Sequence, residues 1–302
     1  MGDEGEQFAE PVPGRGESGG AIRTFKLTLA YDGTGFHGWQ VQPGLPTIQG
    51  ELQAALGRVT GESPLPQGSG RTDAGVHALA QVASFQLAAP IPAENLLRAL
   101  NRTLPGAIRV LDARVVPGTF HARHSAIAKS YEYRIFRGEI CPPWVHPFVL
   151  SYSKRLNFNV LDEAAQVFAG EHDFTSFAAT DPDLATRDGI ASEADGPAGT
   201  NIRTVFFSTW ERQETEAGEL WIYRVRGSGF LHHMVRNFVG AMIDAGRGFT
   251  TVERVREIME ARSRSEAGAT APAAGLFLTS VEYPEQGLEV QSSPPMKTSL
   301  LT

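Results

Sequence analysis

An acidic residue surrounded by glycines is the first feature of the sequence that could carry out chemistry. Asp73 lies in residues 68–75, where Gly68, Gly70 and Gly75 surround it. Glycine adopts backbone conformations with positive φ and lets a ligand approach the main chain closely. Such a segment can therefore hold a carboxylate at the edge of a cleft. On local evidence two interpretations stay open: a catalytic acid, or a glycine-rich turn in which the carboxylate caps the backbone.

Two side chains elsewhere in the chain could assist such an acid. Arg236 lies beside the apolar stripe of a predicted helix. It is either a surface charge or, beside a buried acid, the partner that keeps the acid ionised. Tyr131 lies on a predicted strand. It is either a half-buried aromatic residue of that strand or a ring that stacks on an unpaired base.

Other chemistries have weaker support in the sequence. Asp32 could pair with Asp73 as two acids do in aspartic proteases, but no apolar strand precedes Asp73 to bury it. The neighbours His232 and His233 suggest a metal site, yet residues adjacent on a helix diverge by about 100°, so we predict no metal. Cys141 is the only cysteine, which excludes an internal disulfide and Cys-rich metal clusters. We expect it to be a buried small residue in a turn.

The distribution of charge says more about binding partners than the total charge does. The 302-residue chain has a formal net charge of −7, which taken alone disfavours a polyanionic partner. Residues 1–20 and 181–195 each carry a net −4, so the remainder carries +1. Residues 102–134 concentrate basic side chains, which we call the basic strip: Arg102, Arg109, Arg114, His121, Arg123, His124, Lys129 and Arg134. An exposed strip would suit a phosphate backbone, whereas the alternative is a solvated strand face.

The compartment can also be predicted from composition. No apolar run approaches the roughly 20 residues of a membrane span. The N-terminal segment is rich in Gly, Glu and Pro and resembles neither a secretory signal nor a transit peptide. We therefore expect a cytoplasmic protein that does not enter a membrane.

The elements that must position the candidate residues alternate between strand and helix patterns. Strands are predicted at residues 24–31, 83–87, 108–116, 131–135, 205–210, 220–226 and 276–283. Helices are predicted at residues 47–59, with Thr47 as the cap, and at 93–100, 161–168, 231–243 and 252–261. Strands mixed with helices, including sequential hairpins, favour the α+β class over a doubly wound parallel sheet.

The same patterns predict a division into two α/β domains. Residues 21–118 form the first, which bears Asp73, and residues 119–284 form the second. An acidic loop near residues 181–200 interrupts the second domain. The tails, residues 1–20 and 285–302, carry no periodic pattern, and we predict that they are disordered.

Eight segments between about residues 25 and 284 resemble the tRNA pseudouridine synthase A family, in the order in which that family carries them. They are residues 31–40, 47–52, 70–78, 120–123, 129–133, 170–177, 230–240 and 271–276. Any one of them could arise by chance, but eight in order make the resemblance specific.

The resemblance implies both a fold and an activity. The fold would be two similar α/β halves joined through a mixed, largely antiparallel sheet, with helices packed on it and a central active-site cleft. The activity would be the isomerisation of uridine to pseudouridine at positions 38, 39 and 40 of the tRNA anticodon stem-loop, after the base is flipped out. The resemblance further implies no metal or organic cofactor, a homodimer, and tRNA as the partner.

The resemblance also assigns roles to the candidate residues. Asp73 would be the nucleophile that triggers cleavage of the glycosidic bond, and Arg236 would pair with it. Tyr131 would stack on the flipped uracil and assist deprotonation at C5. Arg71 would enter the RNA where the target base leaves.

Arg123 and Lys129, from the basic strip, are expected to contact RNA. Two other readings of the sequence stay open. One is a catalytically silent RNA-binding relative, and the other is an aspartate-dependent hydrolase.

Overall fold

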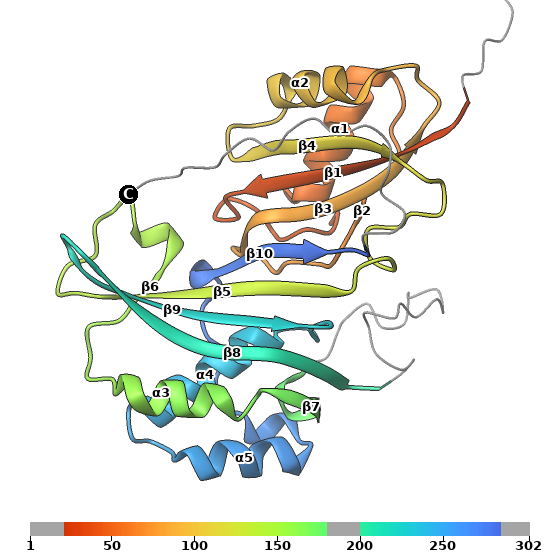
Figure 1. The fold of residues 1–302 in the computed structure, drawn as a ribbon. Helices are drawn as coiled ribbons and strands as arrows, with labels where there is room; N and C mark the ends of the chain where they lie inside the picture. Colours follow the sequence, from red (N-terminus) through yellow and green to blue (C-terminus); the bar gives the residue numbers. More distant parts are fainter. Residues whose placement is uncertain (1–20, 180–199, 285–302) are drawn as a thin grey trace, which may run out of the picture.

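A computed structural model describes residues 21–179 and 200–284 of the chain. The strands are β1 (Arg23–Tyr31), β2 (Gln67–Gly68), β3 (His77–Leu87), β4 (Ile108–Val116), β5 (Ala128–Arg137), β6 (Leu150–Ser151), β7 (Gly170–Asp173), β8 (Ile202–Thr215), β9 (Gly218–Gly227) and β10 (Leu276–Glu282). Within the described residues they form one ten-stranded sheet, in the order β4-β1-β3-β10-β5-β9-β8-β7, with β2 beside β3 and β6 beside β5 (Figure 1).

Helices pack on both halves of this sheet. The α-helices are α1 (Ile48–Thr60), α2 (Ala93–Thr103), α3 (Phe158–Gln166), α4 (Met234–Gly246) and α5 (Val252–Ala261), and the short 3₁₀ helices are η1 (His146–Phe148), η2 (Thr175–Phe177), η5 (Arg264–Glu266) and η6 (Ala273–Gly275). Helices α1 and α2 lie at the β4 end of the sheet, and α3, α4 and α5 lie at the β7 end (Figure 1). Among the described residues, no helix has both the length and the apolar character that crossing a membrane requires.

The N-terminal half follows from period-two strands and an amphipathic helix pair. In β1 the alternate residues Phe25, Leu27 and Leu29 are fully buried, because successive side chains of a strand point to opposite faces. Helix α1 begins where the Thr47 hydroxyl accepts a hydrogen bond from the Gly50 amide, which is the predicted cap. The strands predicted at residues 24–31 and 108–116 and the helices predicted at 47–59 and 93–100 are confirmed, whereas the strand predicted at 83–87 begins earlier, at His77, and β2 was not predicted.

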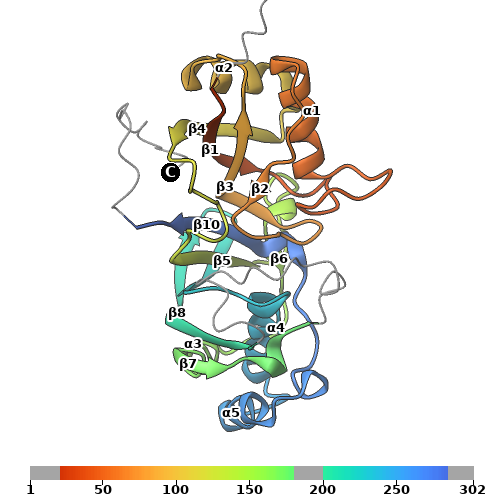
Figure 2. The same cartoon turned by 90° about the vertical axis from the view of Figure 1, so that its right-hand side faces the viewer.

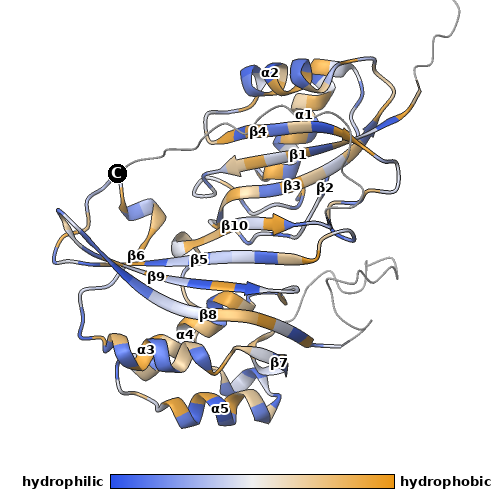
Figure 3. Cartoon of the chain, in the orientation of Figure 1, coloured by the Kyte–Doolittle hydropathy of each residue, from blue (hydrophilic) through white to orange (hydrophobic). Residues whose placement is uncertain are grey.

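The C-terminal half is built around α4. Phe238 of this helix stacks on Phe168 with ring centroids 3.9 Å apart and is buried completely. A Cβ on Gly246 would lie 2.1 Å from Leu161 Cδ1, so glycine lets α3 and α4 pack closely. Helix α4 is buried on nearly all sides, whereas hydrophilic and hydrophobic residues alternate along α3 and α5 (Figure 3).

Strand β10 joins the two halves. Phe277 pairs in parallel with His77 of β3, and Leu278 pairs in antiparallel with Tyr131 of β5. Figure 2 shows β10 between the two halves. The sheet is thus mixed but mostly antiparallel, and the predicted α+β fold class is confirmed.

A buried histidine ties this junction together. The His77 side chain is 1% exposed, and its Nδ1 accepts a hydrogen bond from the Gly33 amide at 3.0 Å. Nε2 lies 3.1 Å from the Pro147 carbonyl oxygen, and the ring stacks on Phe277 at 4.7 Å. Because Nδ1 accepts, the proton of the neutral ring resides on Nε2 and can be donated to Pro147.

The predicted domain boundary at residues 118 and 119 stays a prediction. Strand β10 belongs to the predicted second domain, yet it pairs with β3 of the first. The predicted tails, residues 1–20 and 285–302, lie outside the described residues, as does the acidic loop except for residue 200.

Candidate active site

The loop between β2 and β3 carries Asp73, and hydrogen bonds hold its backbone on both sides of this residue. Before Asp73, the Ser69 amide donates to the Val82 carbonyl at 2.8 Å and the Gln81 amide group donates to the Gly70 carbonyl at 2.9 Å. Directly before Asp73 the Thr72 carbonyl accepts a bond from the Trp39 amide at 3.0 Å, and after it the Gly75 amide donates to the Phe36 carbonyl at 3.3 Å. The carboxylate therefore projects from a fixed loop and not from an unsupported turn.

Two glycines make this arrangement sterically feasible. Gly75 adopts a φ of +77°, in the left-handed region that glycine enters without strain. Gly38 has a φ of +86°, and a Cβ there would lie 2.6 Å from the Thr72 carbonyl oxygen. The segment around Gly38 and the segment around Asp73 are separate in sequence but in direct contact.

Arg236 comes from the first turn of α4 and reaches the Asp73 carboxylate. Its Nη1 lies 2.8 Å from Asp73 Oδ2, and its Nε donates to the Ala271 carbonyl oxygen at 2.8 Å. The two charged side chains are 15% and 19% exposed. Since the guanidinium is held at two points, it presents a fixed positive charge to the carboxylate.

His232 and His233 also converge on Asp73, which corrects the sequence-based reasoning. Their Nε2 atoms lie 3.5 Å from Asp73 Oδ1 and 3.3 Å from Oδ2, respectively. The prediction that the two imidazoles diverge was wrong because α4 begins at Met234, not at Leu231 as predicted. His233 precedes the helix with a left-handed φ of +60°, so the helical angle does not apply to the pair.

This convergence also brings possible metal-ligand atoms together. One atom from each of Asp73, His232 and His233 lies within 4.8 Å of the others. The Arg236 guanidinium, however, bonds to the same carboxylate. Its permanent positive charge disfavours a second cation at that place.

Tyr131 lies beside the acid on the central strand β5. The residue is 9% exposed, and its ring meets that of Phe230 edge-on at 5.1 Å. Burial raises the pKa of the Tyr131 phenol above its ordinary value, and the nearby Tyr31 and Asp73 raise it further. The phenol therefore stays protonated at neutral pH.

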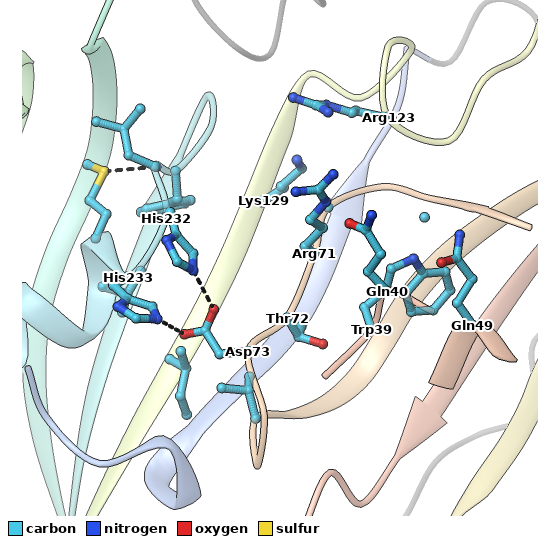
Figure 4. A pocket seen from close by; sticks show the side chains of 18 of the residues that line it. Trp39, Gln40, Gln49, Arg71, Thr72, Asp73, Arg123, Lys129, His232 and His233 are labelled. Atoms are coloured by element: carbon cyan, nitrogen blue, oxygen red, sulfur yellow. Dashed lines mark hydrogen bonds and ion pairs between the residues drawn. The ribbon is translucent and has the colours of Figure 1, made fainter. Parts of the chain in front are cut away.

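A cavity of about 580 Å³ unites these residues. Asp73, Tyr131 and Arg236 line it together with Arg71, Arg123 and Lys129, so every side chain singled out as catalytic or RNA-binding in the sequence lies at one site. Figure 4 shows the Asp73 carboxylate with His232 and His233 on one side and Arg71 and Thr72 on the other. The volume suits a ligand of nucleotide size.

The three candidate RNA contacts differ in their surroundings. Arg71 is exposed and Arg123 is half-buried. Lys129 is only 6% exposed, and its Nζ donates to the Ser69 carbonyl oxygen at 2.7 Å. Lys129 therefore supports the Asp73 loop, which its prediction as an RNA contact did not anticipate.

The basic strip is divided between the cavity and other parts of the molecule, and its role in binding phosphate stays a prediction. Arg102 ends α2, whereas Arg109 and Arg114 lie on the edge strand β4, with Arg114 paired to Asp112 at 2.8 Å. Arg134 bonds to Glu132 at 3.0 Å. The members of the strip that line the cavity are His121, Arg123 and His124, between β4 and β5, and Lys129 on β5.

The two remaining sequence candidates lie apart from this site. Asp32 is not among the residues that line the cavity, and its Oδ1 accepts bonds from the amide and hydroxyl of Thr34. A pair of acids with Asp73 is therefore absent from the described cavity. Cys141 is half-buried, not buried as predicted, and burial raises the pKa of its thiol.

No local signal in the sequence indicated the histidine contacts. His232 and His233 stand between the apolar Leu231 and the Met234 that opens the helix. Their convergence on Asp73 depends on the left-handed backbone of His233, which no periodic pattern records.

Comparison with known proteins shows the family to which a chain with this fold and site belongs. Fold and site together define an α+β protein with an acid-bearing cleft at the centre of its sheet. The sequence model of the family described as tRNA pseudouridine synthase matches residues 28–125 and 164–284.

Curated relatives are similar over nearly their whole length. A tRNA pseudouridine synthase A from Solibacter usitatus is 51% identical over 262 residues, which is 87% of this chain and 100% of that protein. Proteins of the same name from Maridesulfovibrio salexigens and Lacticaseibacillus casei are each 40% identical, over 88% and 86% of this chain and 92% and 99% of their own. The chain therefore belongs to the tRNA pseudouridine synthase family.

Proposed function

We propose that this chain is a tRNA pseudouridine synthase that isomerises uridine to pseudouridine at positions 38, 39 and 40 of the anticodon stem-loop. The observation that carries the proposal is the Asp73 carboxylate, paired with Arg236 at 2.8 Å inside a nucleotide-sized cavity. The curated relatives carry the name tRNA pseudouridine synthase A.

The proposed reaction rearranges bonds without a net change in atoms or electrons. The bond from ribose C1′ to uracil N1 breaks, the freed ring turns, and a bond from C1′ to C5 forms. The C5 proton leaves, and N1 gains a proton. Asp73 acts as the nucleophile that triggers cleavage; the bond that its carboxylate forms to the nucleotide breaks again before product release, so the carboxylate is regenerated beside the Arg236 guanidinium.

Tyr131 and Arg71 act on the flipped nucleotide in this proposal. A buried aromatic ring beside the acid gives the extruded uracil a surface to stack on. Because burial raises the pKa of the Tyr131 phenol, its hydroxyl is protonated in the resting site, where it can donate a hydrogen bond to the uracil. Arg71, exposed at the rim of the cavity, enters the RNA in place of the base, and Arg123 binds phosphate.

The proposal includes no metal or organic cofactor. Carboxylate chemistry on a flipped base needs neither, and Arg236 already supplies the positive charge at Asp73. Protein freed of metal with a chelator and returned to magnesium-containing tRNA buffer should keep its full kcat. A loss of kcat that is reversed by adding zinc would contradict this part of the proposal.

We also propose a homodimer in the cytoplasm. Exposed apolar side chains on β8 support an assembly: Phe206 is 47% exposed and Phe207 is 42% exposed. A lone cysteine in 302 residues suits a reducing compartment. Light scattering should give twice the chain mass of 32.6 kDa, and a monomer at micromolar concentration would contradict the assembly.

A tritium-release assay tests the activity directly. Unmodified tRNA carrying tritium at uracil C5 is incubated with the purified chain, and pseudouridine is then mapped by carbodiimide modification. We expect release of tritium and new pseudouridine at positions 38 to 40. Tight tRNA binding without release would favour a silent RNA-binding relative, and hydrolytic cleavage would favour the aspartate-dependent hydrolase.

A further inference from the structure

Two consecutive imidazoles meet one carboxylate in the cavity, which regular backbone does not allow. Neighbouring residues diverge by about 100° on a helix and point to opposite faces of a strand. The rings of His232 and His233 instead lie 3.9 Å apart, and both Nε2 atoms face Asp73 (Figure 4).

The backbone of His233 makes this convergence possible. Its φ of +60° and ψ of 2° lie in the left-handed region, which is disfavoured for a residue with a Cβ. Among the described residues, His233 and Arg262 are the non-glycine residues with positive φ. Strained conformations of this kind persist where the surroundings hold them, and they gather at functional sites.

The surrounding backbone holds both histidines in place. The Asn237 amide donates to the His233 carbonyl, and the Ala179 amide donates to the His232 carbonyl, each at 2.9 Å. The His233 side chain makes no capping bond to α4, although it occupies the capping position. Its ring is directed to Asp73 instead.

The charge state of His233 suits a contact that leaves the carboxylate reactive. Burial lowers its pKa, as do the charges of His232, Arg236 and Arg264, whereas Asp73 raises it less strongly than burial lowers it. The ring is therefore neutral at pH 7, and a neutral imidazole facing a carboxylate must present its N–H. One neutral donor orients the carboxylate without adding a second full charge beside Arg236.

The contacts are distributed unequally over the two carboxylate oxygens. Oδ2 faces Arg236 at 2.8 Å and His233 at 3.3 Å. Oδ1 faces His232 at 3.5 Å. Holding one oxygen with two donors fixes the rotation of the carboxylate and leaves the other oxygen more weakly engaged.

We infer that His233 is a positioning residue for Asp73. The left-handed backbone of His233 directs an imidazole N–H donor to Asp73 Oδ2, and His232 lies beside it at Oδ1. The inference rests on the proposed role of Asp73 as the nucleophile. It adds to that role the side chains that set the direction of the nucleophilic oxygen.

Three variants separate the ring from the backbone that aims it. His233→Gly keeps the left-handed backbone without strain and removes the ring. His233→Gln restores an amide N–H near the position of Nε2 without a group that titrates. Arg262→Gly is the matched control, because Arg262 also has positive φ but is 69% exposed at the end of α5 and does not line the cavity.

Steady-state kinetics on tRNA and a pH–rate profile test the inference. We expect His233→Gly to keep the wild-type Tm and tRNA KM but to lose about a hundredfold in kcat, as misplaced reacting groups do. His233→Gln should recover about tenfold of that loss. The pH–rate profile of His233→Gln should also lose the part of the acid limb that reports protonation of His233. Arg262→Gly should match wild type in Tm, KM, kcat and pH–rate profile.

Two results would overturn the inference. One is a kcat in His233→Gly that equals the wild-type value. The other is a kcat in His233→Gln that is as low as in His233→Gly, together with an acid limb in His233→Gln that matches the wild-type limb. Asp73→Asn, measured alongside, separates this failure from that of the proposed function. If Asp73→Asn is inactive and His233→Gly is fully active, only the positioning role fails, whereas an active Asp73→Asn rejects the nucleophile itself.

Discussion

At the level of single residues, the site depends on how one carboxylate is held. Arg236 contributes a charge that cannot be removed by pH, and its second bond to the Ala271 carbonyl fixes the direction from which that charge acts. Removing the guanidinium takes away the positive charge beside the carboxylate and also frees the carboxylate to rotate. Both effects act on the chemical step more than on tRNA binding.

Substitution of Arg236 should therefore lower kcat. For Arg236→Ala we expect a loss of at least about a hundredfold in kcat at neutral pH. Arg236→Lys keeps the charge but lacks the planar group that bonds to both Asp73 and the Ala271 carbonyl, so its kcat should fall between those of wild type and Arg236→Ala. An equal kcat in wild type and Arg236→Ala would reject the ion pair as a catalytic requirement.

Tyr131 permits a prediction about proton transfer. Because burial raises the pKa of the phenol, the hydroxyl acts in its protonated form. Tyr131→Phe keeps the ring for stacking and should lower kcat by about tenfold or more, by the same factor at pH 7 and at pH 9. A loss that grows with pH would instead identify the phenolate as the base.

At the level of elements, the loop between β2 and β3 depends on partners from distant parts of the chain. The Lys129 Nζ on β5 donates to the Ser69 carbonyl, and the Tyr31 hydroxyl on β1 bonds to the Thr72 hydroxyl at 2.8 Å. A glycine-rich loop has little rigidity of its own. These contacts are therefore what keep Asp73 in place.

Lys129→Met tests whether this lysine supports the loop or binds RNA. Methionine keeps most of the volume but removes the donor, so we expect a lower Tm and a lower kcat with an unchanged salt dependence of tRNA affinity. Arg71→Ala is the comparison, and it should reduce the salt slope by about one unit. A reduced salt slope in Lys129→Met would show that Lys129 contacts phosphate instead.

The elements themselves could largely be predicted from the sequence. Period-two and helical patterns are local, so β1, α1 and β4 were located to within one or two residues. The start of α4 was misplaced, because apolar Leu231 continues the helical spacing although His233 leaves the helical conformation. Backbone conformation at one residue is set by tertiary contacts, which no periodic pattern records.

The sequence predicted which catalytic residues belong to the site, but not which contacts hold them. The resemblance assigned Asp73, Arg236 and Tyr131, which the fold brings to one cavity. The contact of His232 and His233 with Asp73 joins residues about 160 positions apart, and the burial of Lys129 depends on sheet pairing. Neither follows from local sequence.

At the level of the whole molecule, the cavity lies where the two halves share a sheet. Asp73 comes from the N-terminal half and Arg236 from the C-terminal half, so the ion pair exists only when the halves are joined. Strand β10 and the buried His77 make that junction. Stability of the junction and integrity of the site are thus coupled.

This coupling predicts how stability depends on pH. Burial lowers the pKa of His77 below its ordinary value of 6.5, and the pKa values of His121 and His233 shift in the same direction. The unfolded chain therefore binds more protons, so stability is fully present above 6.5 and declines as pH falls toward the lower folded pKa values.

Thermal unfolding checks the sign of this effect. The Tm should fall between about pH 7.5 and pH 5.5, and the fall should be smaller in His77→Gln, which removes one titrating group. A Tm that rises on acidification would contradict the assignment of His77 as a buried neutral residue.

Asp73→Asn on tritiated tRNA tests the central claim most directly, because the substitution nearly preserves the size of the side chain and replaces the anionic carboxylate with a neutral amide that is a poor nucleophile. The account predicts that tritium release falls by at least about a thousandfold. It also predicts that the tRNA Kd and the Tm stay near the wild-type values. Release at a rate comparable to wild type would contradict the claim that the Asp73 carboxylate is the nucleophile.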